Sequence, residues 1–182
     1  VPPPTISLGQ NLEELIQAPN RPVNQSIGRP DEGRLQKATS LLSVLENLGA
    51  AAGFQILRPL NKRYFATWDM AVLIAKMGEW VSQNIPGQTL SIGNISSQKG
   101  GDQIAHVSHQ NGLDVDIAYF TPGSKNNMEN VVDFKKNKIQ KDFLMADQWT
   151  LFKKLHSTGL IDLIIVDPVI KTALCQQAAQ AG

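Results

Sequence analysis

The sequence has no long hydrophobic run and no excess of charge of one sign. Because it lacks a run of about twenty apolar residues, it predicts no transmembrane helix. Its 17 basic and 16 acidic residues leave a net charge of +1. Bulk charge therefore favours neither a nucleic acid nor an anionic membrane as a partner. Residues 1–5 lack the features of a signal peptide, so we interpret them as the start of a processed or recombinant chain.

Cysteine is almost absent as well. Cys175 is the only cysteine among the 182 residues, so it has no partner for a disulfide within this sequence. An odd cysteine in an exported protein suggests pairing with a separate chain. The alternative is a buried free thiol, because free cysteine packs like a small hydrophobe. The sequence leaves both interpretations open.

What the sequence does contain is a concentration of metal-binding side chains. Two imidazoles and two carboxylates surround a glycine: His106, His109, Asp114, Asp116 and Gly112. Apolar residues alternate with polar or small ones over 113–119, the period of a half-buried strand, so both carboxylates share one face. The glycine supplies a bend that can return His109 over that face. Imidazole and carboxylate are common ligands of catalytic zinc, which takes three protein ligands. The segment therefore predicts part of a zinc site, although the bare His-x6-Asp spacing also arises by chance.

The wider motif resembles a known family. Residues 108–117, Ser-His-Gln-Asn-Gly-Leu-Asp-Val-Asp-Ile, closely resemble the first zinc motif of the penicillin-insensitive murein endopeptidases. This family belongs to the group of zinc peptidases that includes lysostaphin, the D-Ala-D-Ala peptidases and the hedgehog domain. Further blocks resemble the family in the same order, so that the similarity spans residues 26–175. These blocks are residues 26–28, 33–35, 63–67, 92–96, 100–101 and 164–175.

One motif of the family is missing from this sequence. The family completes its site with a C-terminal His-x-His, whose last histidine is the third zinc ligand and whose first assists catalysis. The remaining histidine here, His156, follows a helical pattern and is expected at the surface near a helix C-terminus, where it is a poor substitute. We therefore expect a chain truncated after residues 168–175. A separate C-terminal fragment would then supply the third ligand and a partner for Cys175.

The resemblance implies a zinc metallopeptidase that hydrolyses D-alanyl cross-links between peptidoglycan stem peptides, in the periplasm or outside the cell. It implies that His109 and Asp116 bind Zn²⁺ and that His106 transfers protons or stabilises an oxyanion. Asp114 would orient the ligand imidazole. Plain hydrogen bonding in a loop is the alternative for His106, and a structural hydrogen bond is the alternative for Asp114. With two ligands, this chain alone is expected to bind zinc weakly and to be inactive.

Two other functions remain open. The fold can serve as a catalytically inactive module that binds peptidoglycan or a partner protein, or the site can belong to a D-Ala-D-Ala carboxypeptidase with the same chemistry. Residues 121–141 are rich in lysine, which usually indicates a solvated loop. The sharper alternative is that these lysines contact carboxylates of the stem peptides.

Hydrophobic periodicity predicts the secondary structure. Helices are expected at residues 35–48, 68–81, 143–155 and 168–175, and strands at 54–57, 89–95, 113–120 and 161–166. Thr67 and Asp167 are expected to cap the second and fourth helices. Residues 1–25 are expected to form an extended, proline-rich arm that contains at most a short helix at 11–18. Together these elements predict an α+β domain over residues 26–182 that is C-terminally incomplete. Its small, mainly antiparallel sheet is expected to be flanked by helices, as the resemblance to hedgehog and the D-Ala-D-Ala peptidases implies.

Overall fold

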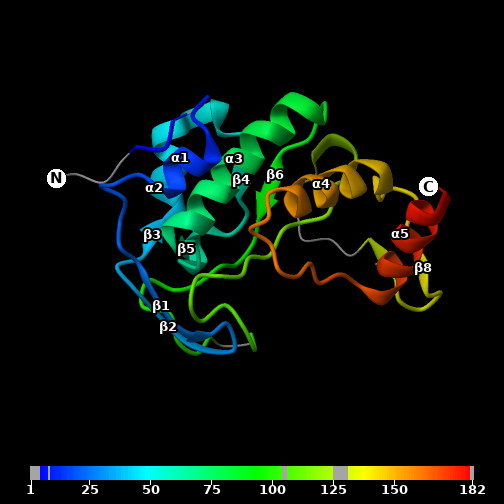
Figure 1. Cartoon of the computed structure of the whole chain (residues 1–182). Helices are drawn as coiled ribbons and strands as arrows, with labels where there is room; N and C mark the ends of the chain where they lie inside the picture. The colour runs from blue at the N-terminus through cyan, green and yellow to red at the C-terminus, as the bar shows by residue number, and fades with distance from the viewer. Residues whose placement is uncertain (1–4, 8, 104–105, 125–130, 181–182) are drawn as a thin grey trace. The chain divides into compact units, whose positions relative to one another are not determined.

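The structure is a computed structural model that describes residues 5–7, 9–103, 106–124 and 131–180 (Figure 1). Helices alternate with short strand pairs, most of them antiparallel, which confirms the predicted α+β class. The chain divides into two compact units, Val1–Ala118 and Tyr119–Gly182. Each unit is described by itself.

In the first unit, the longest helix is α3 (Trp68–Asn84), which was predicted with its cap. The Thr67 hydroxyl accepts a hydrogen bond from the Met70 backbone N–H at 3.3 Å, and Asp69 lies in the first turn, where its charge suits the helix dipole. The helix continues to Asn84, beyond the predicted end. It contacts α1 (Leu12–Ile16), α2 (Leu41–Leu48) and the turn η1 (Gly49–Ala52) (Figure 1).

The strands of this unit are short. They are β1 (Gln25–Arg29), β2 (Glu32–Gln36), β3 (Thr39–Ser40), β4 (Phe54–Ile56), β5 (Phe65–Ala66) and β6 (Leu90–Ile92), with the turn η2 (Pro59–Asn61) before β5. The pairs β1–β2 and β3–β5 are antiparallel, whereas β4 and β6 run parallel. The predicted strands at 54–57 and 89–95 are thus confirmed in shortened form.

The strand predicted at 113–120 is not regular. A single antiparallel bridge joins Ile117 to Ile92, and the Ala118 N–H donates to the Ser91 carbonyl at 2.9 Å. The Asp116 N–H donates to the Asn94 carbonyl at 2.9 Å, and the Gly93 N–H donates to the Asp116 carbonyl at 2.8 Å. Residues 116–118 therefore follow the edge of β6 opposite β4 without a continuous ladder. This pairing is enough to place Asp116 beside β6.

The helix predicted over residues 35–48 is wrong in its first half. Leu35 lies in β2, opposite Ser26 of β1, and is buried there in an extended conformation. The helix begins only after Ser40, whose hydroxyl accepts from the Ser43 backbone N–H at 3.3 Å. The apolar spacing fitted a helix, but the β1–β2 hairpin offers its backbone groups a partner strand, and long-range pairing overrides local periodicity.

The expected N-terminal arm contains α1 and packs on the first unit over its described residues. Ile6 and Leu15 are buried, and the indole N–H of Trp68 donates to the Leu15 carbonyl at 2.9 Å. Asn11 caps α1 by accepting from the Glu13 N–H at 2.9 Å. The short helix predicted at 11–18 is therefore present.

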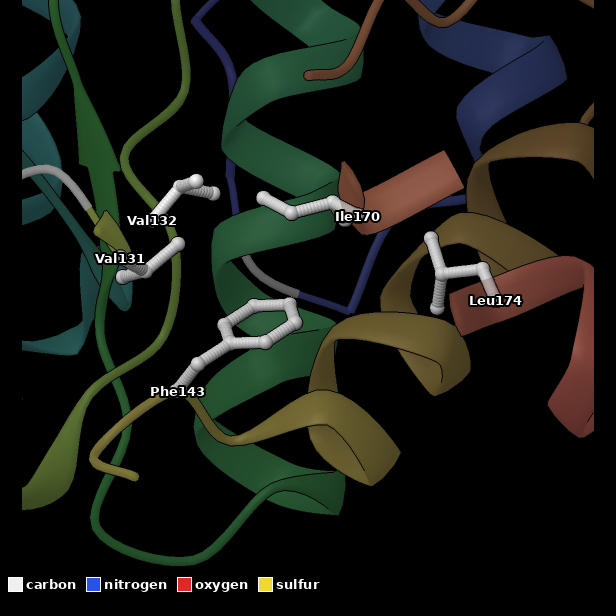
Figure 2. Packing of buried hydrophobic residues seen from close by; sticks show 5 residues of the cluster. All are labelled: Val131, Val132, Phe143, Ile170 and Leu174. Carbon is white, nitrogen blue, oxygen red and sulfur yellow. The ribbon is translucent and has the colours of Figure 1, made fainter. Parts of the chain in front are cut away.

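The second unit contains α4 (Met145–Ser157) and α5 (Pro168–Gln180), the hairpin β7 (Val132–Asp133) and β8 (Lys138–Ile139), and the turn η3 (Pro122–Ser124). Its buried cluster combines side chains from the β7–β8 hairpin, from the segment that precedes α4 and from α5. Figure 2 shows the cluster: Val131, Val132, Phe143, Ile170 and Leu174. As predicted, Asp167 caps α5, accepting from the Val169 N–H at 2.8 Å. Lys135, Lys136, Lys138 and Lys141, the lysines of residues 121–141 that the structure describes, are exposed, as expected for a solvated segment.

The strand predicted at 161–166, buried on both faces, is wrong. The segment forms no strand, and among the described residues no strand pairs with it. Leu163 is 73% exposed and Ile165 is 84% exposed, while Ile164 and Val166 are half-buried. An apolar run shows hydrophobicity but not whether covering elements exist on both sides. In the described part of the chain, no helix is both long and apolar enough to span a membrane.

Cys175 is exposed on α5, so it is not the buried thiol that was one of the two expectations. We predict that it reacts with a small thiol reagent in the folded chain at nearly the rate seen in denaturant. The matched control is Leu174→Cys in a Cys175→Ser chain, because position 174 is buried, and labelling there should be at least about tenfold slower. Equal protection at both positions would contradict the exposure of Cys175.

Candidate metal centre

His109 is the buried centre of the site. The residue is 5% exposed and has a φ of 71°, a left-handed conformation that few residues other than glycine adopt. Two contacts hold this conformation: the His109 N–H donates to Oδ2 of Asp114 at 3.2 Å, and the side-chain amide of Gln103 donates to the His109 carbonyl. The backbone is thus fixed on both sides of the imidazole.

Two carboxylates flank the His109 ring. Nδ1 lies 3.0 Å from Oδ2 of Asp114, and Nε2 lies 3.2 Å from Oδ1 of Asp116. The turn that makes this possible passes through Gly112, whose φ is 74°, and an added Cβ there would lie 2.8 Å from the Leu35 side chain. Both carboxylates therefore meet one imidazole, in keeping with the alternation of residues 113–119.

The charges of the two carboxylates control protonation of this imidazole. Burial alone would lower the pKa of His109, but the contacts with Asp114 and Asp116 outweigh it and raise the pKa to about 9. Burial alone would raise the pKa of Asp116, but the His109 contact and a hydrogen bond from the Asn94 side chain lower it. Without a metal, the site at neutral pH is thus a histidinium held between two carboxylates.

His106 joins the same cluster. One ligand atom each from His106, His109 and Asp116 lie within 4.8 Å of one another, and the two imidazoles meet edge to face at 5.3 Å between centroids. Burial lowers the pKa of His106, and the positive charge of Arg63 lowers it further. His106 is therefore a neutral imidazole at physiological pH, beside a charged one.

Asn94 is a member of the site that our sequence reasoning did not assign. Its side chain is buried, and its Nδ2 lies 3.3 Å from Nε2 of His106. The only signal in the sequence was its place in the block at residues 92–96. His156, exposed at the end of α4 in the second unit, is not part of the cluster formed by the described residues.

The β1–β2 hairpin braces the loop that carries His109. The side chain of Gln110 accepts from the Gly33 N–H at 3.1 Å and donates to the Asp31 carbonyl at 3.0 Å. Asn111, fully buried, donates to the Gly28 carbonyl at 3.1 Å. An added Cβ at Gly33 would lie 2.8 Å from Cβ of Asn111, so the hairpin and the loop are in close contact. The two residues that precede Gly112 are therefore tied to a separate pair of strands.

The arrangement suits a small divalent metal ion. Two imidazoles and a carboxylate form the donor set, and the 3.2 Å between Nε2 of His109 and Oδ1 of Asp116 is close to the roughly 3.3 Å that separates two ligand atoms in a tetrahedral site with bonds of about 2 Å. The contact of Nδ1 with Asp114 leaves Nε2 as the ligand atom of His109, a common arrangement for metal-binding imidazoles. The sequence predicted two ligands, and the structure brings a third potential ligand, His106, to the same place.

Comparison with known proteins agrees with this geometry. Residues 26–181 match the sequence profile described as penicillin-insensitive murein endopeptidase. The chain belongs to this family. The match runs through both compact units, so the similarity is not limited to the motif around His109.

Individual relatives in the murein endopeptidase family have low sequence identity to this chain, but they align with most of its length. A penicillin-insensitive murein endopeptidase of Haemophilus influenzae is 28% identical over 173 residues, 85% of this chain and 59% of the relative. That of Escherichia coli O157:H7 is 27% identical over 183 residues, 96% of this chain and 64% of the relative. That of Yersinia enterocolitica is 30% identical over 141 residues, 70% of this chain and 50% of the relative. The chain thus spans less than two thirds of the length of each.

The raised pKa of His109 predicts that the metal-free chain loses stability in alkali. A pKa raised from 6.5 to about 9 stabilises the folded chain fully below pH 6.5, and this contribution is lost as the pH rises through about 9. We expect the free energy of unfolding to fall by roughly 3 kcal/mol at most over this range. Urea unfolding in a chelator measures it, and Asp114→Asn, which removes one of the two charges, should flatten the dependence. A flat profile in the unmodified chain would contradict the contact.

Proposed function

We propose that this chain is the site-bearing part of a zinc-dependent murein endopeptidase that hydrolyses D-alanyl cross-links between peptidoglycan stem peptides. One observation carries the proposal: the His109 imidazole is buried between Asp114 and Asp116, with His106 beside it, in a chain of the murein endopeptidase family. Cell-wall hydrolysis places the protein outside the cytoplasm, in the periplasm or secreted.

In this proposal His109 and Asp116 bind the zinc ion, since an imidazole and a carboxylate are among its usual ligands. When bound, zinc supplies Lewis-acid catalysis, polarising a peptide carbonyl and activating water. A third ligand comes from the His-x-His motif of the family, carried by a segment or fragment outside this sequence. Asp114 keeps the His109 ring oriented by its contact with Nδ1 at 3.0 Å.

His106 is proposed as the proton-transfer residue of this site. A general base must be unprotonated at the working pH and close to the reacting groups. The lowered pKa of His106 meets the first condition, because burial and the charge of Arg63 both disfavour its protonation. Its place within 4.8 Å of the other two donors meets the second.

Positive charge near the cluster supports an anionic substrate. The positive charges of Arg63 and, more weakly, Arg58 lower the pKa of His106. The stem peptides of peptidoglycan carry carboxylates, which pair well with guanidinium. We therefore assign substrate attraction to these arginines.

The function is tested with purified cross-linked muropeptide dimers. This chain should leave them intact, and the chain extended by the His-x-His segment of a relative should convert them to monomers in a chelator-sensitive reaction. In the extended protein, His109→Ala and Asp116→Ala should each reduce hydrolysis by at least about 10³-fold, because each removes a metal ligand. Hydrolysis that persists in either variant would refute the assignment.

Matched controls and products separate the alternatives. His156→Ala and Asp102→Ala change the same residue types at exposed positions and should retain activity within about twofold. Release of terminal D-alanine without dimer cleavage would indicate a carboxypeptidase. Binding to murein sacculi without any hydrolysis would indicate an inactive binding module. Chelator-sensitive cleavage by the unextended chain would show that His106 completes the ligand set.

Zinc binding should release a proton, because the metal must displace it from His109. With a pKa of about 9, His109 is protonated at pH 7 in the metal-free chain, and a ligand imidazole must be neutral. We expect about one proton released per zinc at pH 7 and an affinity that rises about tenfold per pH unit up to about pH 9. Titration calorimetry in two buffers of different ionisation enthalpy gives the proton count. A count near zero would mean that His109 is already neutral or does not bind the metal.

A further inference from the structure

Gln103 contacts the backbone of both histidines of the candidate site. Its carbonyl accepts a hydrogen bond from the His106 N–H at 3.0 Å, and the two residues form an antiparallel bridge. Its side chain reaches further along the chain, where Nε2 donates to the His109 carbonyl. One residue outside the donor set therefore holds the main chain at both imidazole-bearing positions.

The side-chain contact of Gln103 completes the fixation of His109. The His109 N–H donates to Oδ2 of Asp114 at 3.2 Å, which holds the peptide group before the residue. Gln103 holds the peptide group after it. Because the φ of 71° lies in the left-handed region, which is unfavourable for residues other than glycine, this conformation persists only where such contacts impose it.

The amide of Gln103 is poorly suited to a role in stability alone. The side chain is buried, and its Oε1 has no hydrogen-bond partner among the described residues. A buried acceptor without a partner costs free energy, so an apolar side chain of similar size would suit a purely structural position better. Departures of this kind from the most stable choice are typical of functional sites. The donor end of the amide, which contacts His109, is therefore the reason we assign to its presence.

We propose that Gln103 is a positioning residue that holds His109 in its left-handed conformation and thereby keeps Nε2 of the imidazole 3.2 Å from Oδ1 of Asp116. The inference rests on the proposed function and deepens it, because it names the contact that prepares two ligand atoms before the metal arrives. Without the donor, the peptide after His109 relaxes and the imidazole moves with its Cα. Gln103 acts only through His109.

The first test measures amide hydrogen exchange in this metal-free chain. Gln103→Met keeps a side chain of similar length and the backbone contact with His106, and it removes only the donor to His109. The His109 N–H should then exchange at least about tenfold faster, because it opens locally. The Ile95 N–H, which donates to the Arg63 carbonyl at 2.8 Å, should change by less than about twofold. A role in stability alone would not single out His109.

The second test measures the affinity of this chain for zinc by titration calorimetry. Gln103→Met should weaken binding by about tenfold, the lower end of the effect seen when a group that orients a ligand is lost. Gln148→Met is the matched control, because it also replaces a buried glutamine that contacts the main chain: Oε1 of Gln148 accepts from the Phe120 N–H at 3.0 Å. It should leave both the zinc affinity and the exchange at His109 unchanged.

The third test uses hydrolysis by the extended protein. Gln103→Met should lower activity by about tenfold at limiting zinc, and saturating zinc should restore most of it, because every ligand is still present. His109→Ala should not be restored, since it lacks a ligand. Equal failure of both variants at saturating zinc would overturn a role through ligand placement.

The outcomes keep the two proposals distinct. Unchanged exchange at His109 in folded Gln103→Met overturns the role of Gln103 whatever the enzyme does, and so does an unchanged zinc affinity. If Gln103→Met fails to fold, Gln103→Asn decides by the same criteria, because its amide is one methylene shorter and cannot keep the contact. Faster exchange at His109 and weaker zinc binding, in a protein that hydrolyses no muropeptide in any form, support the role of Gln103 and refute the proposed function.

Discussion

The structure of the site depends on one imidazole held between two carboxylates. Burying a charged group costs free energy unless partners compensate for it, and His109 meets this requirement through Asp114 on Nδ1 and Asp116 on Nε2. The same arrangement suits a metal, since the ion can replace the proton on Nε2 while Asp114 keeps its contact. A site that is stable when protonated and correctly oriented for a cation needs little rearrangement between the two states.

The surrounding fold supplies the constraints that this contact needs. The left-handed backbone of His109 costs of order 1 kcal/mol or more and persists only where neighbours enforce it. Gln103 and Asp114 do so directly, and the hairpin holds the next residue through Gln110. On the other side of the site, residues 116–118 pair with β6 and the residues that follow it. This pairing places Asp116 next to Asn94. The positions of the candidate ligands His109 and Asp116 therefore depend on these few hydrogen bonds.

Sequence patterns predicted elements that are specified locally. The caps of α3 and α5 were recognised because Thr67 and Asp167 satisfy N–H groups only two or three residues away. The errors occur where distant partners decide the outcome. Leu35 fits a helical period but pairs across a hairpin, and residues 161–166 fit a buried strand, yet Leu163 and Ile165 are exposed. Periodicity identifies the apolar face of a segment but not what lies against it.

By itself the sequence determined which residue types form the site: two histidines and two aspartates around Gly112, for which the family resemblance implied metal binding. It also determined that both aspartates share a face, because side chains alternate along an extended segment. Only the tertiary structure decided that both carboxylates meet the same imidazole, that His106 joins them, and that Asn94 contacts His106 and Asp116. The reason is that these contacts depend on the β6 pairing and the hairpin, which bring together residues that are up to 83 positions apart in the chain.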